Sequence, residues 1–174
     1  MTPDQLMARE ARVLQVRLEF GLASLEEVEL WADAWVWSVD KPPDALSDVC
    51  SLARTWGPNI VYPAISRIGG EITPRDVVRA LKDVDPQSLS FDQLARIITS
   101  LSQWAYVLIQ YDADEAWPFL DLANGDFDLP SLQHPERVNA AKREAYCADM
   151  RDAISCIRDF ARKQDAEETQ RAGA

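Results

Sequence analysis

Helix start and stop signals recur along the chain and constrain its fold more than any other feature. Three segments carry the capping-box pattern of a helix start, a Ser or Thr followed three residues later by Glu or Gln; they begin at Thr2, Ser24 and Ser90. After these signals, apolar residues recur at steps of three and four, as on one face of a helix. No segment shows the sustained apolar–polar alternation of a strand. The sequence therefore predicts an all-α fold.

Glycine and proline divide this pattern into about seven or eight helices. The expected breaks include Gly21, Pro42-Pro43, Gly57-Pro58, Gly69-Gly70, Asp85-Pro86 and Asn124-Gly125, and a shorter helix is expected to begin at about Asp112. The most apolar helix should run from about 91 to 109, so we expect it to be central, with Ile98 and Trp104 buried. The segment from Pro135 to about 170 has no internal Gly or Pro and is typical of one long helix.

A chain of 174 residues is long enough for one full hydrophobic core and short for two. We therefore expect a single all-α bundle over 1–162. No large apolar residue follows Ala161, so the tail 163–174 should fray.

The composition favours a protein of the cytoplasm. No apolar run approaches the ~20 residues of a membrane span, and the N-terminus lacks the apolar stretch of a secretory signal. The three cysteines show no CxxC spacing and cannot all pair internally, so we expect reduced and mostly buried thiols.

Acidic residues are gathered in two blocks, 21–50 and 86–135, while the rest of the chain is close to neutral. Each block has seven acids against one base, within a net charge of −11. Direct nucleic-acid binding needs clustered Lys and Arg, so the sequence argues against it. Segregated acid instead suggests a surface for a basic protein partner, and we expect the acidic stretches 21–50 and 112–128 to converge on one face. If they lie apart, they are ordinary solvated faces.

Two of the six tryptophans are candidate contact residues. Trp31 and Trp35 share one helix face, whereas Trp37 points elsewhere and should be exposed if Trp35 is buried. Trp117 lies in the most acidic stretch. An aromatic ring among carboxylates is typical of a surface that binds a basic partner. The expected partner-binding residues are Glu26, Glu29, Asp33, Trp37, Asp112, Asp114, Glu115, Trp117, Asp121, Asp126 and Asp128.

No catalytic motif or cofactor-binding motif accompanies these residues. The loop 121–128 resembles a calcium site, but with Gly125 at position 6 of an EF-hand the ligand positions 1, 3 and 12 are all leucines. His134 is the only histidine, which leaves little for a metal site or a nucleophile pair. We therefore expect no enzyme activity, no metal and no cofactor.

The segment FGLASLEEVELWAD at 20–33, followed by DKPP at 40–43, resembles an N-terminal pattern of small bacterial proteins. Several of those proteins are similar to the immunity proteins of contact-dependent or polymorphic toxin systems. The resemblance implies a cognate toxin domain that is neutralised by stoichiometric binding. It assigns no role to any single residue.

These observations lead to two hypotheses of different kinds. In the first, the protein is an immunity or inhibitor protein that occludes a basic surface of a toxin domain. In the second, it is a helical scaffold or chaperone-like adaptor that works as a homodimer. The second hypothesis requires an exposed apolar stripe on the last helix, formed by Ala145, Met150, Ile154 and Ile157.

Overall fold

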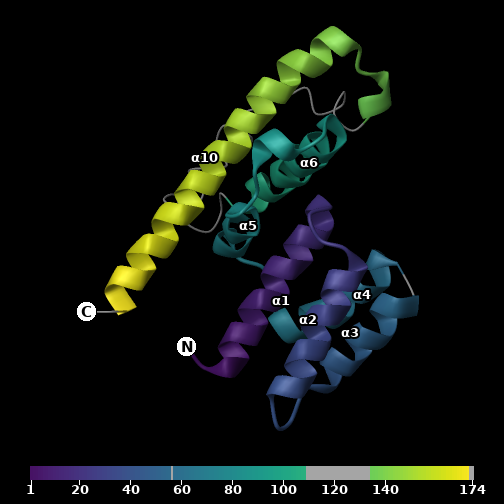
Figure 1. Ribbon diagram of the computed structural model, residues 1–174, viewed down its shortest axis with the longest axis vertical. Coiled ribbons are helices and arrows are strands. Elements are labelled where there is room, and N and C mark those ends of the chain that lie inside the picture. The colour runs from purple at the N-terminus through teal and green to yellow at the C-terminus, as the bar shows by residue number, and fades with distance from the viewer. Residues whose placement is uncertain (56, 109–133, 173–174) are drawn as a thin grey trace. The chain divides into compact units, whose positions relative to one another are not determined.

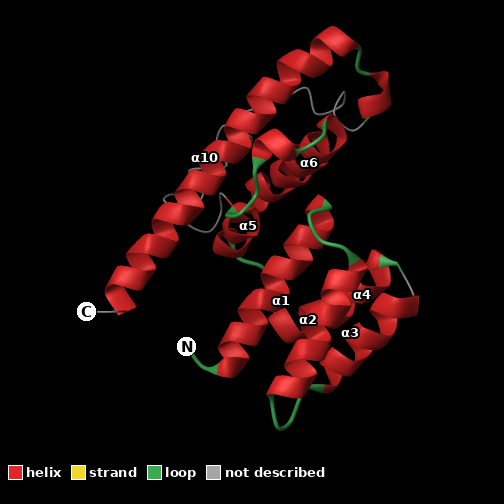
Figure 2. Ribbon diagram, in the orientation of Figure 1, coloured by secondary structure: helices red, strands yellow, loops and turns green. Residues whose placement is uncertain are grey.

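The computed structural model describes residues 1–55, 57–108 and 134–172 (Figure 1). Within these ranges it contains helices and connecting loops and no strand, so the all-α prediction is confirmed (Figure 2). The described α-helices are α1 (Pro3–Phe20), α2 (Leu25–Ser38), α3 (Asp44–Thr55), α4 (Pro58–Gly69), α5 (Pro74–Leu81), α6 (Phe91–Leu108) and α10 (Ala140–Ala172). Two short 3-10 helices are η1 (Pro86–Ser88) and η3 (Pro135–Arg137). The helix expected near 112–124 lies outside the described residues.

The described residues form two compact units, Met1–Asp76 and Val77–Ala174, where we expected one domain over 1–162. Apolar spacing shows which face of a helix is buried, but not which other helix covers it. The expectation of a single all-α domain over 1–162 stays a prediction. Each unit is described by itself.

The three predicted capping boxes are all present. In each, the Ser or Thr side chain accepts a hydrogen bond from the backbone N–H three residues on, and the Gln or Glu side chain accepts one in return. Gly21 ends α1 in the left-handed conformation, at φ 70°, which a residue without a Cβ adopts easily. Ser24 then starts α2 three residues later, so these local signals form a tight corner between α1 and α2.

In the first unit, α1 packs on α4, α2 packs on α3, and α3 packs on α4 (Figure 1). The core between them is apolar and fully enclosed at Val28, Ala32, Leu46, Val49, Val61 and Ile65. Gly69 at the end of α4 is also buried, and a Cβ there would lie 2.9 Å from Arg12 Cγ and 3.1 Å from the Arg12 backbone nitrogen. The absence of a side chain at Gly69 therefore allows α1 to approach α4 closely.

Polar side chains link α1 to its neighbours. The indole N–H groups of Trp31 and Trp35 both donate to Glu10 Oε2, at 3.1 and 2.8 Å. Arg12 donates to the buried Asp76 carboxylate at 2.7 Å, and Asp76 also accepts from the backbone and hydroxyl of Thr73. Because buried polar groups are costly when unpaired, these bonds fix the position of α1 within the unit.

In the second unit, α10 packs on α6 and on η1. The residues that α10 buries are Met150, Ile154, Ile157 and Ala161, and α6 buries Leu94, Ile97, Ile98 and Leu101. The prediction for Ile98 is confirmed. The prediction for Trp104 is wrong, because Trp104 is only partly buried. Apolar spacing predicts the side of a helix that faces the core, but not how far the cover extends along it.

The long last helix differs from its expected limits at both ends. Pro135 opens the separate turn η3, and α10 starts only at Ala140, where Asn139 Oδ1 accepts from the Lys142 backbone N–H at 3.0 Å. The helix continues to Ala172, whereas we expected fraying from 163.

Ion pairs explain why α10 continues. Asp165 lies 2.5 Å from Lys82 Nζ and 3.5 Å from Arg79 Nε, so the tail is tied to the end of α5 and the residue after it. Partial burial raises the pKa of Asp165, but the pairing with Lys82 and Arg79 outweighs it and leaves this pKa below its ordinary value. Charge pairing therefore replaces the apolar contacts that the tail lacks.

None of the described helices combines the length and the apolar character that a bilayer crossing requires.

Candidate functional site

Helix α2 carries all four of the described residues that the sequence predicted as partner contacts. Its inner side is closed by Val28 and Ala32, which are fully buried. One flank turns Trp31 and Trp35 toward Glu10 of α1. The opposite flank turns Glu29 and Asp33 toward Arg54 of α3. The remaining side faces solvent.

That solvent side is apolar along its middle. Leu30, Ala34 and Trp37 follow one another at steps of four and three, so they lie in one line along the helix. Leu30 is 62% exposed and Trp37 is 88% exposed, and Ala34 is exposed as well. We call these three residues the outer row. Single exposed apolar residues are common, but three in line on one helix form a continuous surface with no cover among the described residues.

α2 and α3 also carry acidic side chains, and several of these are paired with arginines. Glu26 and Glu27 are exposed in the first turn of α2, where they also favour the helix dipole. Glu29 and Asp33 both pair with Arg54, and Asp48 pairs with Arg67 at 2.5 Å. The block 21–50 is therefore partly neutralised by arginines that lie outside it in sequence.

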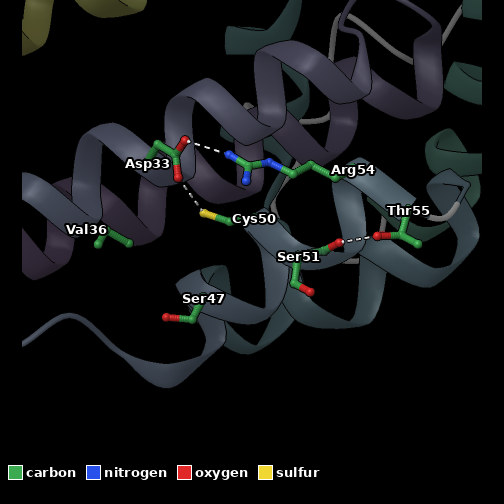
Figure 3. Close-up of a pocket in the computed structure, with 7 residues that line it drawn as sticks. All are labelled: Asp33, Val36, Ser47, Cys50, Ser51, Arg54 and Thr55. Carbon is green, nitrogen blue, oxygen red and sulfur yellow. Dashed lines mark hydrogen bonds and ion pairs between the residues drawn. The ribbon is translucent and has the colours of Figure 1, made fainter.

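A pocket of about 380 Å³ opens between α2 and α3, beside the outer row (Figure 3). Asp33 and Val36 line it from α2, and five residues line it from α3: Ser47, Cys50, Ser51, Arg54 and Thr55. In Figure 3, the Asp33 carboxylate points toward both the Cys50 thiol and the Arg54 guanidinium. The thiol donates to Asp33 Oδ1 at 3.1 Å, and Arg54 Nη2 lies 3.5 Å from Asp33 Oδ2.

Cys50 is a protonated thiol at neutral pH. Burial, and then its hydrogen bond to the Asp33 carboxylate, raise its pKa to about 11. A thiolate would face the charge of Asp33, so this pocket does not activate Cys50 as a nucleophile. The three cysteines are free thiols, as expected, but none of them is buried, and Cys156 is exposed on α10. The expectation of mostly buried thiols is wrong.

Across the described part of the chain, no three His, Cys, Asp or Glu side chains lie close enough to hold a metal ion together. The acidic loop 121–128, for which we predicted no metal, lies outside the described residues, and so that prediction stays open to test.

The structure brings together Glu26, Glu29, Asp33 and Trp37 on α2, and it confirms that Trp37 is exposed. The other predicted contacts lie outside the described residues: Asp112, Asp114, Glu115, Trp117, Asp121, Asp126 and Asp128. The convergence of the two acidic blocks therefore stays a prediction.

Sequence reasoning missed two parts of this site. Leu30 and Ala34 lie outside the apolar stripe that predicts the buried side of α2. Their position off that stripe could have predicted an exposed apolar row. Arg54 was missed because its pairing with Glu29 and Asp33 joins residues more than twenty positions apart.

No family model, no curated protein and no solved structure matches this chain. The geometry of the site therefore carries the functional argument by itself, and the resemblance of 20–43 to toxin-immunity proteins stays a prediction.

Proposed function

We propose that this chain is a non-catalytic immunity or inhibitor protein of the bacterial cytoplasm, which neutralises a toxin domain by covering a basic surface of it. One observation carries the proposal: α2 presents Leu30, Ala34 and Trp37 to solvent in one line, with the exposed carboxylates of Glu26 and Glu27 in the first turn of the same helix. The apolar row supplies area to bury, and the acids supply attraction to a basic partner.

The two kinds of residue should act on different steps of binding. Burial of a Leu or an aromatic side chain contributes about 1.5–3 kcal/mol, and such central anchors mainly slow dissociation. Exposed carboxylates such as Glu26 contribute little to affinity but speed encounter with a basic surface, and salt weakens this effect.

The alternative function, a homodimeric scaffold, depended on an exposed apolar stripe on the last helix. Met150, Ile154 and Ile157 are instead fully buried, and only Ala145 of that stripe is exposed. No observation on α10 favours the scaffold function, and we do not propose it.

The test is surface plasmon resonance against a candidate toxin domain that has a basic surface, at two salt concentrations. Trp37→Ala should speed dissociation by about tenfold or more, as for a central interface anchor. Ile60→Ala is the matched control, since Ile60 is a partly exposed apolar residue on α4, away from α2. Equal losses for both variants, or none for Trp37→Ala, would remove the outer row from the interface.

A second arm tests the acids. Glu26→Lys should slow association and flatten its dependence on salt, with little change in dissociation. Charge reversal at Asp112, Asp114 and Glu115 should do the same if the second acidic block joins this face. An unchanged association rate for both sets contradicts a role for the acidic surface in encounter.

A further inference from the structure

We propose that the pocket between α2 and α3 receives one arginine side chain of the protein partner, with its guanidinium paired to Asp33. The inference rests on the proposed function and specifies the chemistry that the partner must present. No residue of the outer row lines the pocket itself, although Trp37 of that row lies one turn from Asp33 and takes part in the proposed arginine site.

The pocket is large enough to receive a single arginine side chain. Its volume of about 380 Å³ lies at the lower end of the ~300–1,000 Å³ range of ligand pockets, which argues against a large cofactor. It lies between two helices of the same compact unit, α2 and α3, which pack on each other. The walls are therefore held by the fold, and a partner side chain can enter without rearranging it.

The charges around the pocket favour a cation. Asp33 and Arg54 line the pocket with opposite charges, and Glu29, which does not line it, pairs with Arg54 and adds a second negative charge to this cluster. The Cys50 thiol is uncharged at neutral pH, because burial and the Asp33 hydrogen bond raise its pKa to about 11. The cluster therefore carries one net negative charge, which repels an anionic ligand and attracts a cation.

Asp33 has capacity for a stronger donor than those it now faces. A carboxylate offers about four lone-pair positions. One oxygen of Asp33 accepts from a thiol, which is a weak donor, and the other lies 3.5 Å from Arg54 Nη2, at the limit of a hydrogen bond. The side chain is 40% exposed, so a guanidinium from outside can reach it.

Other groups suit the remaining atoms of an arginine. The exposed hydroxyls of Ser47 and Ser51 line the pocket and can accept from a guanidinium N–H (Figure 3). Trp37 lies four residues after Asp33, one turn along the same side of α2, and its exposed ring can stack on a guanidinium. A lysine offers a point charge without this planar fork, so arginine fits better.

The probe is the peptide acetyl-Gly-Arg-Gly-amide, titrated into the full-length ¹⁵N-labelled protein by NMR. The control peptide carries citrulline, which has nearly the shape of arginine without its charge. We expect saturable shifts at Ser47, Ser51 and the Trp37 indole for the arginine peptide and none for the citrulline peptide. Equal shifts for both peptides, or shifts spread over all exposed acids, would overturn the proposal.

Two variants test the pocket by separate routes. Asp33→Asn removes the charge and should weaken the arginine peptide about fivefold, the scale of one exposed ion pair. Ser51→Phe fills the pocket from an exposed position, leaves both carboxylates in place, and should abolish the shifts. Asp40→Asn removes an exposed acid of the same block and should change nothing. If only Asp33→Asn acts, or if Asp40→Asn acts equally, the pocket is not the site.

The inference and the proposed function can fail separately. If Trp37→Ala weakens the toxin complex but Asp33→Asn and Ser51→Phe do not, the outer row binds the partner and the pocket is unused. If the arginine peptide binds in the pocket but Trp37→Ala leaves the toxin complex unchanged, the pocket recognises arginine and the proposed interface is wrong.

Discussion

Helices α2 and α10 both carry a line of apolar residues at helical spacing, but the line on α10 is buried and the line on α2 is exposed. On α10, the line that includes Ile154 and Ile157 is buried within the second unit. On α2, Val28 and Ala32 already fill the inner side, so Leu30 and Trp37 form a second line that faces solvent. An apolar helix face thus predicts a core contact only when the helix has no other apolar face to bury.

The largest expected contrast is in stability. Ile154→Ala should lower the free energy of unfolding by about 2–5 kcal/mol, because it leaves a cavity in the core of the second unit. Urea denaturation followed by circular dichroism measures this loss. A loss below about 1 kcal/mol would place Ile154 in a loosely packed contact and weaken the comparison.

The next effect concerns the flank of α2 that faces α1. Glu10→Ala leaves the indole N–H groups of Trp31 and Trp35 without their acceptor and should cost about 1–3 kcal/mol. Glu10→Gln keeps an acceptor oxygen and is the matched control. Urea denaturation again measures the loss in the free energy of unfolding. Equal losses for both variants would mean that the charge of Glu10, and not the hydrogen bonds, stabilises this flank.

A smaller effect concerns the tail of α10. The folded pKa of Asp165 lies below its unfolded value of 3.8, so its contribution is present above that value and is lost as pH falls through the folded pKa. Asp165→Asn should therefore cost about 0.5–1 kcal/mol at pH 7. It should also speed hydrogen exchange over residues 163–172. A deficit that persists unchanged at pH 2–3, or unchanged exchange at pH 7, contradicts the role of the ion pairs.

The smallest expected effect is on the outer row itself. Leu30→Ala should change the free energy of unfolding by no more than about 0.5 kcal/mol, because Leu30 is mostly exposed. On the proposed function, the same variant should weaken the complex with a toxin domain. A loss of stability comparable to that of Ile154→Ala would show that Leu30 is buried in solution. The apolar lines of α2 and α10 would then not differ in exposure.

Much of the fold could be predicted because its signals are local. A capping box joins residues three apart, and all three boxes, at Thr2, Ser24 and Ser90, form as the sequence indicates. Gly21 and Gly70 end α1 and α4 at the expected positions, since positive φ angles favour glycine. The buried side of α6 follows from its apolar spacing through Ile98.

The features that sequence could not supply all join distant parts of the chain. Asp165 finds its partners at Lys82 and Arg79, and Glu29 finds Arg54 on the next helix. One part of the candidate site could be predicted from the sequence and another could not. The exposure of Trp37 follows from its angle to Trp35, whereas the pocket beside Asp33 depends on how α2 and α3 pack.

The close crossing at Gly69 has a consequence for recognition that lies far from α4. Gly69 contacts α1 at Ala11 and Arg12, and the preceding residue, Glu10, holds two indoles of α2. A methyl group at position 69 would press on the α1 backbone and carry Glu10 with it. We expect this displacement to reach α2 through the two indole hydrogen bonds and to change the direction in which Trp37 points. On the proposed function, a substitution at Gly69 would then alter binding of the partner without changing any of the predicted contact residues.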